Sequence, residues 1–100
     1  MNYKLQYSPE AKSELQESYD YYCSKSVRVG DNFLEKIEET VAFILRYPTM
    51  FPVTIRNIRK AVVHKFPYLI LYFIEDENIF VLSIFHTKQD PQKWIKRLNE

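Results

Sequence analysis

The sequence predicts a single α+β domain: an N-terminal strand and an antiparallel helical hairpin packed on a three- to four-stranded, mainly antiparallel sheet, with a short C-terminal helix. Three observations predict this fold. The two longest segments with helical periodicity lie in the first half of the chain, and the extended apolar segments lie in the second half. One hundred residues, of which 46% are hydrophobic and 16% aromatic, provide one hydrophobic core. We therefore expect one domain over residues 1–100.

The first elements follow from local patterns. Residues 2–7 alternate between apolar and polar side chains and predict a strand. Ser8-Pro9-Glu10 then predicts a helix start, because serine caps the first turn, proline needs no N–H donor there, and glutamate complements the helix dipole. The apolar stripe of this helix consists of Ala11, Leu15, Tyr19 and Tyr22.

A second helix follows after a short interruption at residues 24–26. It is expected to begin between Val27 and Asp31, since Gly30 weakens that end, and to stop at Pro48. Its apolar positions are Phe33, Ile37, Val41, Ile44 and Leu45. The short gap predicts that the two helices form an antiparallel hairpin.

The second half of the chain predicts the sheet. Residues 47–52 carry two prolines and predict a loop, and residues 58–66 predict a strand with charged side chains on both faces, which favours an edge position. The pattern leaves open which face of this strand is exposed. Residues 69–74 and 79–85 are almost entirely apolar and predict an antiparallel hairpin. A short helix is expected from Pro91, capped by Gln89 or Asp90, with Trp94, Ile95 and Leu98 on its apolar side.

Several classes of site are excluded by composition and motif. Cys23 is the single cysteine, so neither an internal disulfide nor a cysteine-based zinc site is possible. The chain carries no Gly-rich phosphate loop, His-x-x-x-His or Gly-x-Ser-x-Gly, and the acidic residues are expected on helix surfaces. We predict no metal or cofactor. No signal-peptide pattern and no apolar run of about 20 residues is present, so we expect a cytoplasmic protein without membrane contact.

Charge is unevenly distributed although the net charge is only +1. Residues 8–45 contain eight acidic and four basic residues, whereas residues 46–74 contain five basic residues and no acidic ones. A local positive field can attract phosphates or an acidic protein surface. The residues predicted to bind a target are Arg56, Arg59, Lys60, Lys65, His86 and Lys88. Alternatively, the lysines and arginines are ordinary solvated strand residues.

Two segments of the sequence resemble the RelE/ParE superfamily of bacterial toxins. The first is Phe66-Pro67-Tyr68-Leu69-Ile70-Leu71-Tyr72, preceded by Pro48 and Ile58-Arg59. The second is Ile84-Phe85-His86-Thr87-Lys88-Gln89-Asp90-Pro91, followed by Trp94. The predicted order of elements also matches this superfamily over nearly the whole chain. The resemblance implies a toxin of a type II toxin–antitoxin pair, which a small antitoxin neutralises by wrapping a helical segment around it.

The superfamily has two branches with different targets. RelE-like members cut messenger RNA on the ribosome, whereas ParE-like members poison DNA gyrase. The low net charge, and the absence of a tyrosine after His86, favour the ParE-like branch, although Lys88-Gln89 stand where that branch commonly carries an arginine pair. We therefore predict a toxin that inhibits gyrase by binding. In the alternative of a ribosome-dependent endoribonuclease, His86, His64 and Arg59 would be catalytic; a third alternative is a divergent, non-toxic interaction module.

Overall fold

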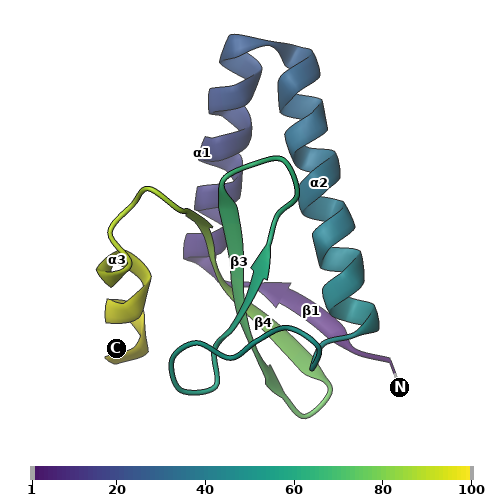
Figure 1. The fold of residues 1–100 in the computed structure, drawn as a ribbon, viewed down its shortest axis with the longest axis vertical. Helices are drawn as coiled ribbons and strands as arrows, with labels where there is room; N and C mark the ends of the chain where they lie inside the picture. The colour runs from purple at the N-terminus through teal and green to yellow at the C-terminus, as the bar shows by residue number, and fades with distance from the viewer. Residues whose placement is uncertain (1, 100) are drawn as a thin grey trace.

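A computed structural model, which describes residues 2–99, shows two helices against a four-stranded mixed sheet (Figure 1). In chain order the elements are β1 (Lys4–Tyr7), α1 (Pro9–Lys25), α2 (Val27–Arg46), β2 (Arg59–Val62), β3 (Tyr68–Glu75), β4 (Asn78–His86), α3 (Gln92–Ile95) and a 3-10 helix (Lys96–Asn99). The strand order in the sheet is β1-β4-β3-β2. β1 pairs with β4 in parallel, and the other two pairs are antiparallel. The predicted α+β fold is confirmed.

The start of α1 is the predicted one. The Ser8 hydroxyl accepts a hydrogen bond from the Ala11 amide at 3.0 Å, and Pro9 occupies the first helical position. The first strand is shorter than predicted, since it begins at Lys4 and not at residue 2. Its last pair with β4 is Tyr7 with Val81, because Ser8 then turns the chain into α1.

The junction between the two helices is a single residue, Ser26. Its N–H donates to the Tyr22 carbonyl at 2.9 Å and its hydroxyl accepts from the Val29 amide at 3.4 Å, so it ends α1 and begins α2. The predicted break at residues 24–26 is therefore wrong in extent, because Ser24 and Lys25 are helical. The helices approach closely here: a Cβ added to Gly30 would lie 2.2 Å from the Cys23 sulfur.

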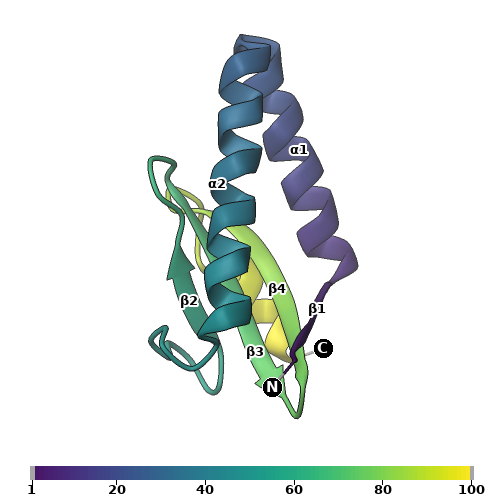
Figure 2. The same ribbon diagram turned by 90° about the vertical axis from the view of Figure 1, so that its right-hand side faces the viewer.

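The sheet is covered on both faces (Figure 2). The helical hairpin buries one face, as predicted, in a cluster of Ala11, Phe33, Ile37, Ile44, Ala61, Val63, Tyr68, Ile70, Tyr72, Ile79, Val81 and Ile84. α3 covers part of the other face, where Ile58, Leu71, Phe85 and Trp94 form a second cluster. This double coverage explains why β3 and β4 are apolar almost throughout.

Strand β2 differs from its prediction. It lies at the edge of the sheet as expected, but it ends at Val62, and His64 and Lys65 lie in a turn where Lys65 has a φ of 69°. The buried side chains of Ala61 and Val63 face the helical hairpin. Since side chains alternate along a strand, Arg59 faces the hairpin as well, and Lys60 faces the α3 side.

Two side chains of the sheet hold the loop that follows α2. The Tyr72 hydroxyl, fully buried, donates to the Pro48 carbonyl at 2.6 Å. One guanidinium nitrogen of Arg59 donates to the carbonyls of Thr49 and Phe51, at 3.1 and 2.6 Å. The buried proline carbonyl thereby gains a partner, and the loop is fixed against the centre of the sheet.

Replacement of Tyr72 by phenylalanine tests this anchor through pH. Burial raises the pKa of Tyr72 to about 12 from the ordinary value of 10.0, although the Arg59 charge opposes the shift. Between these values the unfolded chain has lost the proton and the folded chain keeps it, so stability falls as the pH rises. Tyr72→Phe should cost about 1 kcal/mol at pH 7 and show a weaker loss of stability above pH 10.

The measurement is urea unfolding of both proteins at pH 7 and at steps up to about pH 11.5. Tyr19 and Tyr22, whose pKa values are also raised to about 12, remain in both proteins, so the difference between the two curves isolates Tyr72. A difference that stays constant across the alkaline range would show that Tyr72 does not titrate as described.

Candidate functional site

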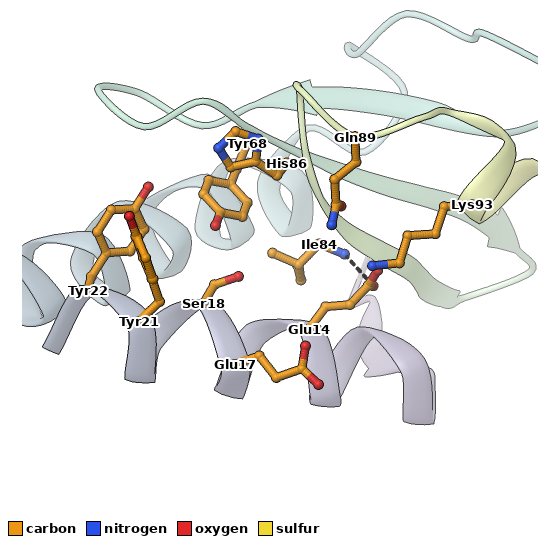
Figure 3. Close-up of a pocket in the computed structure, with 10 residues that line it drawn as sticks. All are labelled: Glu14, Glu17, Ser18, Tyr21, Tyr22, Tyr68, Ile84, His86, Gln89 and Lys93. Carbon is orange, nitrogen blue, oxygen red and sulfur yellow. Dashed lines mark hydrogen bonds between the residues drawn. The ribbon is translucent and has the colours of Figure 1, made fainter. Parts of the chain in front are cut away.

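The outer edge of β4 is longer than the strand that covers it. β1 pairs only with residues Asn78–Val81, whereas β4 continues to His86. Beyond Val81, helix α1 runs beside β4 in place of a strand. Between α1, the end of β4 and α3 lies a pocket of about 350 Å³ (Figure 3).

A bulge marks the point where β1 leaves the sheet. Leu71 pairs with Ser83 and Tyr72 with Val81, so Leu82 is an extra residue in β4. Its carbonyl accepts hydrogen bonds from the Ser8 hydroxyl at 3.1 Å and from the Arg97 guanidinium at 3.0 Å. Side chains of α1 and the C-terminal 3-10 helix therefore replace the missing strand partner here.

Glu14 provides the next hydrogen-bond acceptor along this edge of β4, at Ser83 and Ile84. Its carboxylate accepts from the Ile84 amide at 3.2 Å and the Ser83 hydroxyl at 3.0 Å. Arg97 donates to both oxygens of the same carboxylate, at 3.0 and 3.3 Å. The two side chains are only 10% and 13% exposed, so this is a largely buried, bidentate ion pair.

The expectation that the acidic residues lie on helix surfaces is wrong for Glu14. The sequence contains a signal for its burial, because position 14 is three residues after Ala11 and four before Ser18, within the inward-facing stripe of α1. A charge inside an apolar stripe predicts a buried partner, and nothing in the periodicity identifies Arg97, 83 residues away, as that partner.

The pocket has two walls of different chemistry. α1 contributes Glu17, Ser18, Tyr21 and Tyr22, and the opposite side consists of Tyr68, Ile84, His86, Gln89 and Lys93. The rings of Tyr21 and Tyr22 rise from α1 toward Tyr68 and His86 (Figure 3). Burial raises the pKa of Tyr22 to about 12, with a further contribution from Tyr68.

His86 is held in a defined state at the end of β4. Its ring contacts Tyr68 edge-on, with 5.0 Å between centroids, and its Nδ1 accepts the Lys88 amide hydrogen bond at 3.0 Å. In the neutral ring the proton is therefore on Nε2, and this nitrogen can only donate. In this arrangement His86 has no free lone pair with which to remove a proton from a substrate.

The structure does not bring the predicted target-binding residues together. Of the six, only His86 lines the pocket. Arg59 pairs with Tyr72, four residues along β3 from Tyr68, which pairs with His86. At about 3.3 Å per residue and 4.8 Å per strand, the backbones of Arg59 and His86 are separated by roughly 13 Å along the strands and 10 Å across them.

The other predicted residues are spread over the surface. Arg56 donates to the Leu98 carbonyl at 3.1 Å, and Lys60 lines a smaller, mainly apolar groove of about 250 Å³ beside Trp94. Lys65 and Lys88 are exposed. A role for these residues in target binding stays a prediction. Within residues 2–99, no three potential metal ligands cluster, and no helix combines the length and hydropathy needed to cross a membrane.

Comparison with known proteins decides the family. Residues 5–91 match the family described as the ParE toxin of type II toxin-antitoxin system, parDE. The chain belongs to the ParE toxin family. The fold is similar to a solved chain of the chromosomal ParDE TA system from P. aeruginosa, with a TM-score of 0.63 and 15% sequence identity, over 86% of this chain and 97% of that chain. No curated protein sequence matches this one.

This ParE-family membership confirms the resemblance seen in the sequence. The match covers β1 through the start of the C-terminal segment, and therefore includes α1 and β4, which form most of the pocket. Arg97, which completes the ion pair with Glu14, lies beyond the matched residues.

Glu14→Gln should destabilise the domain strongly. The substitution leaves the Arg97 guanidinium largely buried without a carboxylate, and we expect a loss of about 2–4 kcal/mol in the free energy of unfolding, measured in urea. Glu17→Gln, three residues away and exposed, is the matched control and should change stability by less than about 0.5 kcal/mol. Equal effects of the two substitutions would show that the ion pair contributes no more than a surface charge.

Proposed function

We propose that this chain is the toxin of a type II toxin–antitoxin pair, that it inhibits DNA gyrase by binding it, and that a cognate antitoxin neutralises it in the cytoplasm. The observation that carries the proposal is the match of residues 5–91 to the ParE toxin family.

The geometry supports inhibition by binding over cleavage of RNA. The three residues that would be catalytic in a nuclease are separated: His86 lies at the end of β4, His64 in the turn after β2, and Arg59 faces the hairpin, where it binds loop carbonyls. The Nδ1 atom of His86 accepts the Lys88 amide hydrogen bond, so the other nitrogen of the neutral ring is a donor and cannot serve as a general base.

The charge of the pocket is nearly balanced, which favours a protein target over RNA. The α1 wall carries the exposed Glu17 carboxylate, Lys93 lines the opposite side, and Arg97 compensates the charge of Glu14. Tight binding of RNA phosphates depends on a surplus of cations, and the lining residues do not provide one. The exposed cations Lys65 and Lys88, together with Arg56, Lys60 and His86, are the residues that we propose contact the target.

Purified gyrase tests this proposal. In a supercoiling assay, the protein should inhibit at concentrations comparable to that of gyrase, because a binder must match its target in number. Lys88→Glu should raise the concentration for half-inhibition about fivefold or more, by reversing a charge at a contact. Lys12→Glu reverses an exposed charge on α1, outside the proposed contact residues, and should leave inhibition unchanged.

The alternative activity is tested in parallel by primer extension on a defined messenger in a purified translation system. New ends within ribosome-covered codons, produced at sub-stoichiometric protein, would contradict the gyrase proposal. Full supercoiling at a large excess of this protein would contradict it as well. The antitoxin is expected to be a small acidic or mixed-charge protein encoded next to this chain, which co-purifies with it and restores supercoiling.

A further inference from the structure

We propose that the pocket between α1 and the end of β4 binds an arginine side chain of a partner protein. This inference deepens the proposed function, since it names the chemistry by which a partner is recognised. Two observations support it. Of two carboxylates on one face of α1, one is paired with a guanidinium and the other is not, and aromatic residues line the same pocket.

Glu14 and Glu17 lie three residues apart and both line the pocket. Glu14 already binds a guanidinium, that of Arg97, through both of its oxygens. Glu17 is exposed, and no ion pair joins it to another residue within the described range 2–99. At this pocket α1 therefore already binds one guanidinium through Glu14, and Glu17 is a second carboxylate that is not paired with a cation.

Aromatic rings line the same pocket as Glu17, whose exposed side chain runs along α1 toward Glu14 (Figure 3). Tyr21 is one turn beyond Glu17, and its ring already accepts a cation, since the Lys25 ammonium lies 5.3 Å from the ring centroid. Tyr21 packs edge-on against Tyr22 with 5.2 Å between centroids. A carboxylate combined with tyrosine rings is the environment in which a desolvated cation gains from both charge and the ring quadrupole.

The acceptors are spread over the pocket, which favours arginine over lysine. Five of the lining residues carry a side-chain oxygen that can accept a hydrogen bond: Glu17, Ser18, Tyr21, Tyr22 and Tyr68. A guanidinium is planar and carries five N–H donors in a fixed fork, whereas an ammonium is a compact point charge with three. Only the guanidinium can stack against a ring and donate to a carboxylate and a phenol at the same time.

Lys93 is the cation of this chain that competes for the site. It lines the pocket from the α3 side and is exposed. Its long stem allows the ammonium to move into solvent when a ligand enters. Lys93 therefore lowers the affinity for a cation and would raise the affinity for an anion, so its removal distinguishes the two kinds of ligand.

The probe is N-acetyl-L-arginine amide, added to the full chain and followed by NMR. The signals of Tyr21, Tyr22 and His86 should shift and saturate, at millimolar concentrations for so small a ligand. Glu17→Gln should weaken binding by at least about threefold, since a partly exposed carboxylate contributes modestly. Lys93→Met should strengthen binding by about twofold. Glu35→Gln, which removes an exposed charge from α2, is the matched control and should bind like the unchanged protein.

Two further ligands are the negative controls for arginine binding. N-acetyl-norleucine amide has an apolar side chain, and N-acetyl-glutamate amide has the opposite charge. The inference is overturned if arginine amide gives no saturable shift, if either probe binds as well, if Lys93→Met weakens binding, or if Glu17→Gln binds unchanged.

The titration contains no gyrase, so its outcome is separate from that of the proposed function. Saturable arginine binding together with failure to inhibit gyrase would support this inference and overturn the proposed target. Inhibition of gyrase without arginine binding would overturn this inference alone.

Discussion

The ion pair between Glu14 and Arg97 holds together parts of the chain that the sheet alone would leave apart. β1 covers only the first half of the outer edge of β4, and a sheet edge with unpaired amides and carbonyls is costly to bury. Glu14 accepts from the Ile84 amide, and Arg97 donates to the Leu82 carbonyl. Each partner of the ion pair thus also completes a backbone hydrogen bond, which is the condition under which a buried pair can be tolerated.

The pocket exists because of this arrangement. If a strand continued along β4, its backbone would fill the space that α1 leaves open. The helix instead passes beside β4 at the distance set by the Glu14 contacts and carries Glu17, Tyr21 and Tyr22 along the same side. His86 lies on the other side because β4 ends there, paired with Tyr68, and Lys93 lies there because the C-terminal segment returns to α1 through Arg97.

Much of the fold could be predicted from the sequence because local patterns determine it. Ser8-Pro9 starts α1 at the expected residue, and the apolar segments of β3 and β4 predict a hairpin covered on both faces. The length of β2 could not be predicted, because residues 58–66 have strand composition throughout, and the turn at His64 and Lys65 depends on tertiary contacts and a positive φ.

The site was less predictable than the fold, since it depends on pairing across long sequence distances. His86 directly follows an apolar segment that predicts a strand, and it lines the pocket. Glu17 and Lys93 have no local sequence pattern that separates them from other solvated charges. The cluster of basic residues predicts Arg59 as a target-binding residue, whereas the structure places its guanidinium against the carbonyls of the loop after α2.

The position of Arg59 has a consequence for genetic selection. Colonies that survive expression of an active toxin carry any substitution that lowers the amount of folded protein as well as those that remove a contact with the target. Arg59 and Tyr72 fix one loop from the same strand pair, so survivors at these two positions should show the same thermal profile and the same low abundance. Survivors at exposed residues that accumulate to normal levels are the ones that would map the surface through which the proposed target is bound.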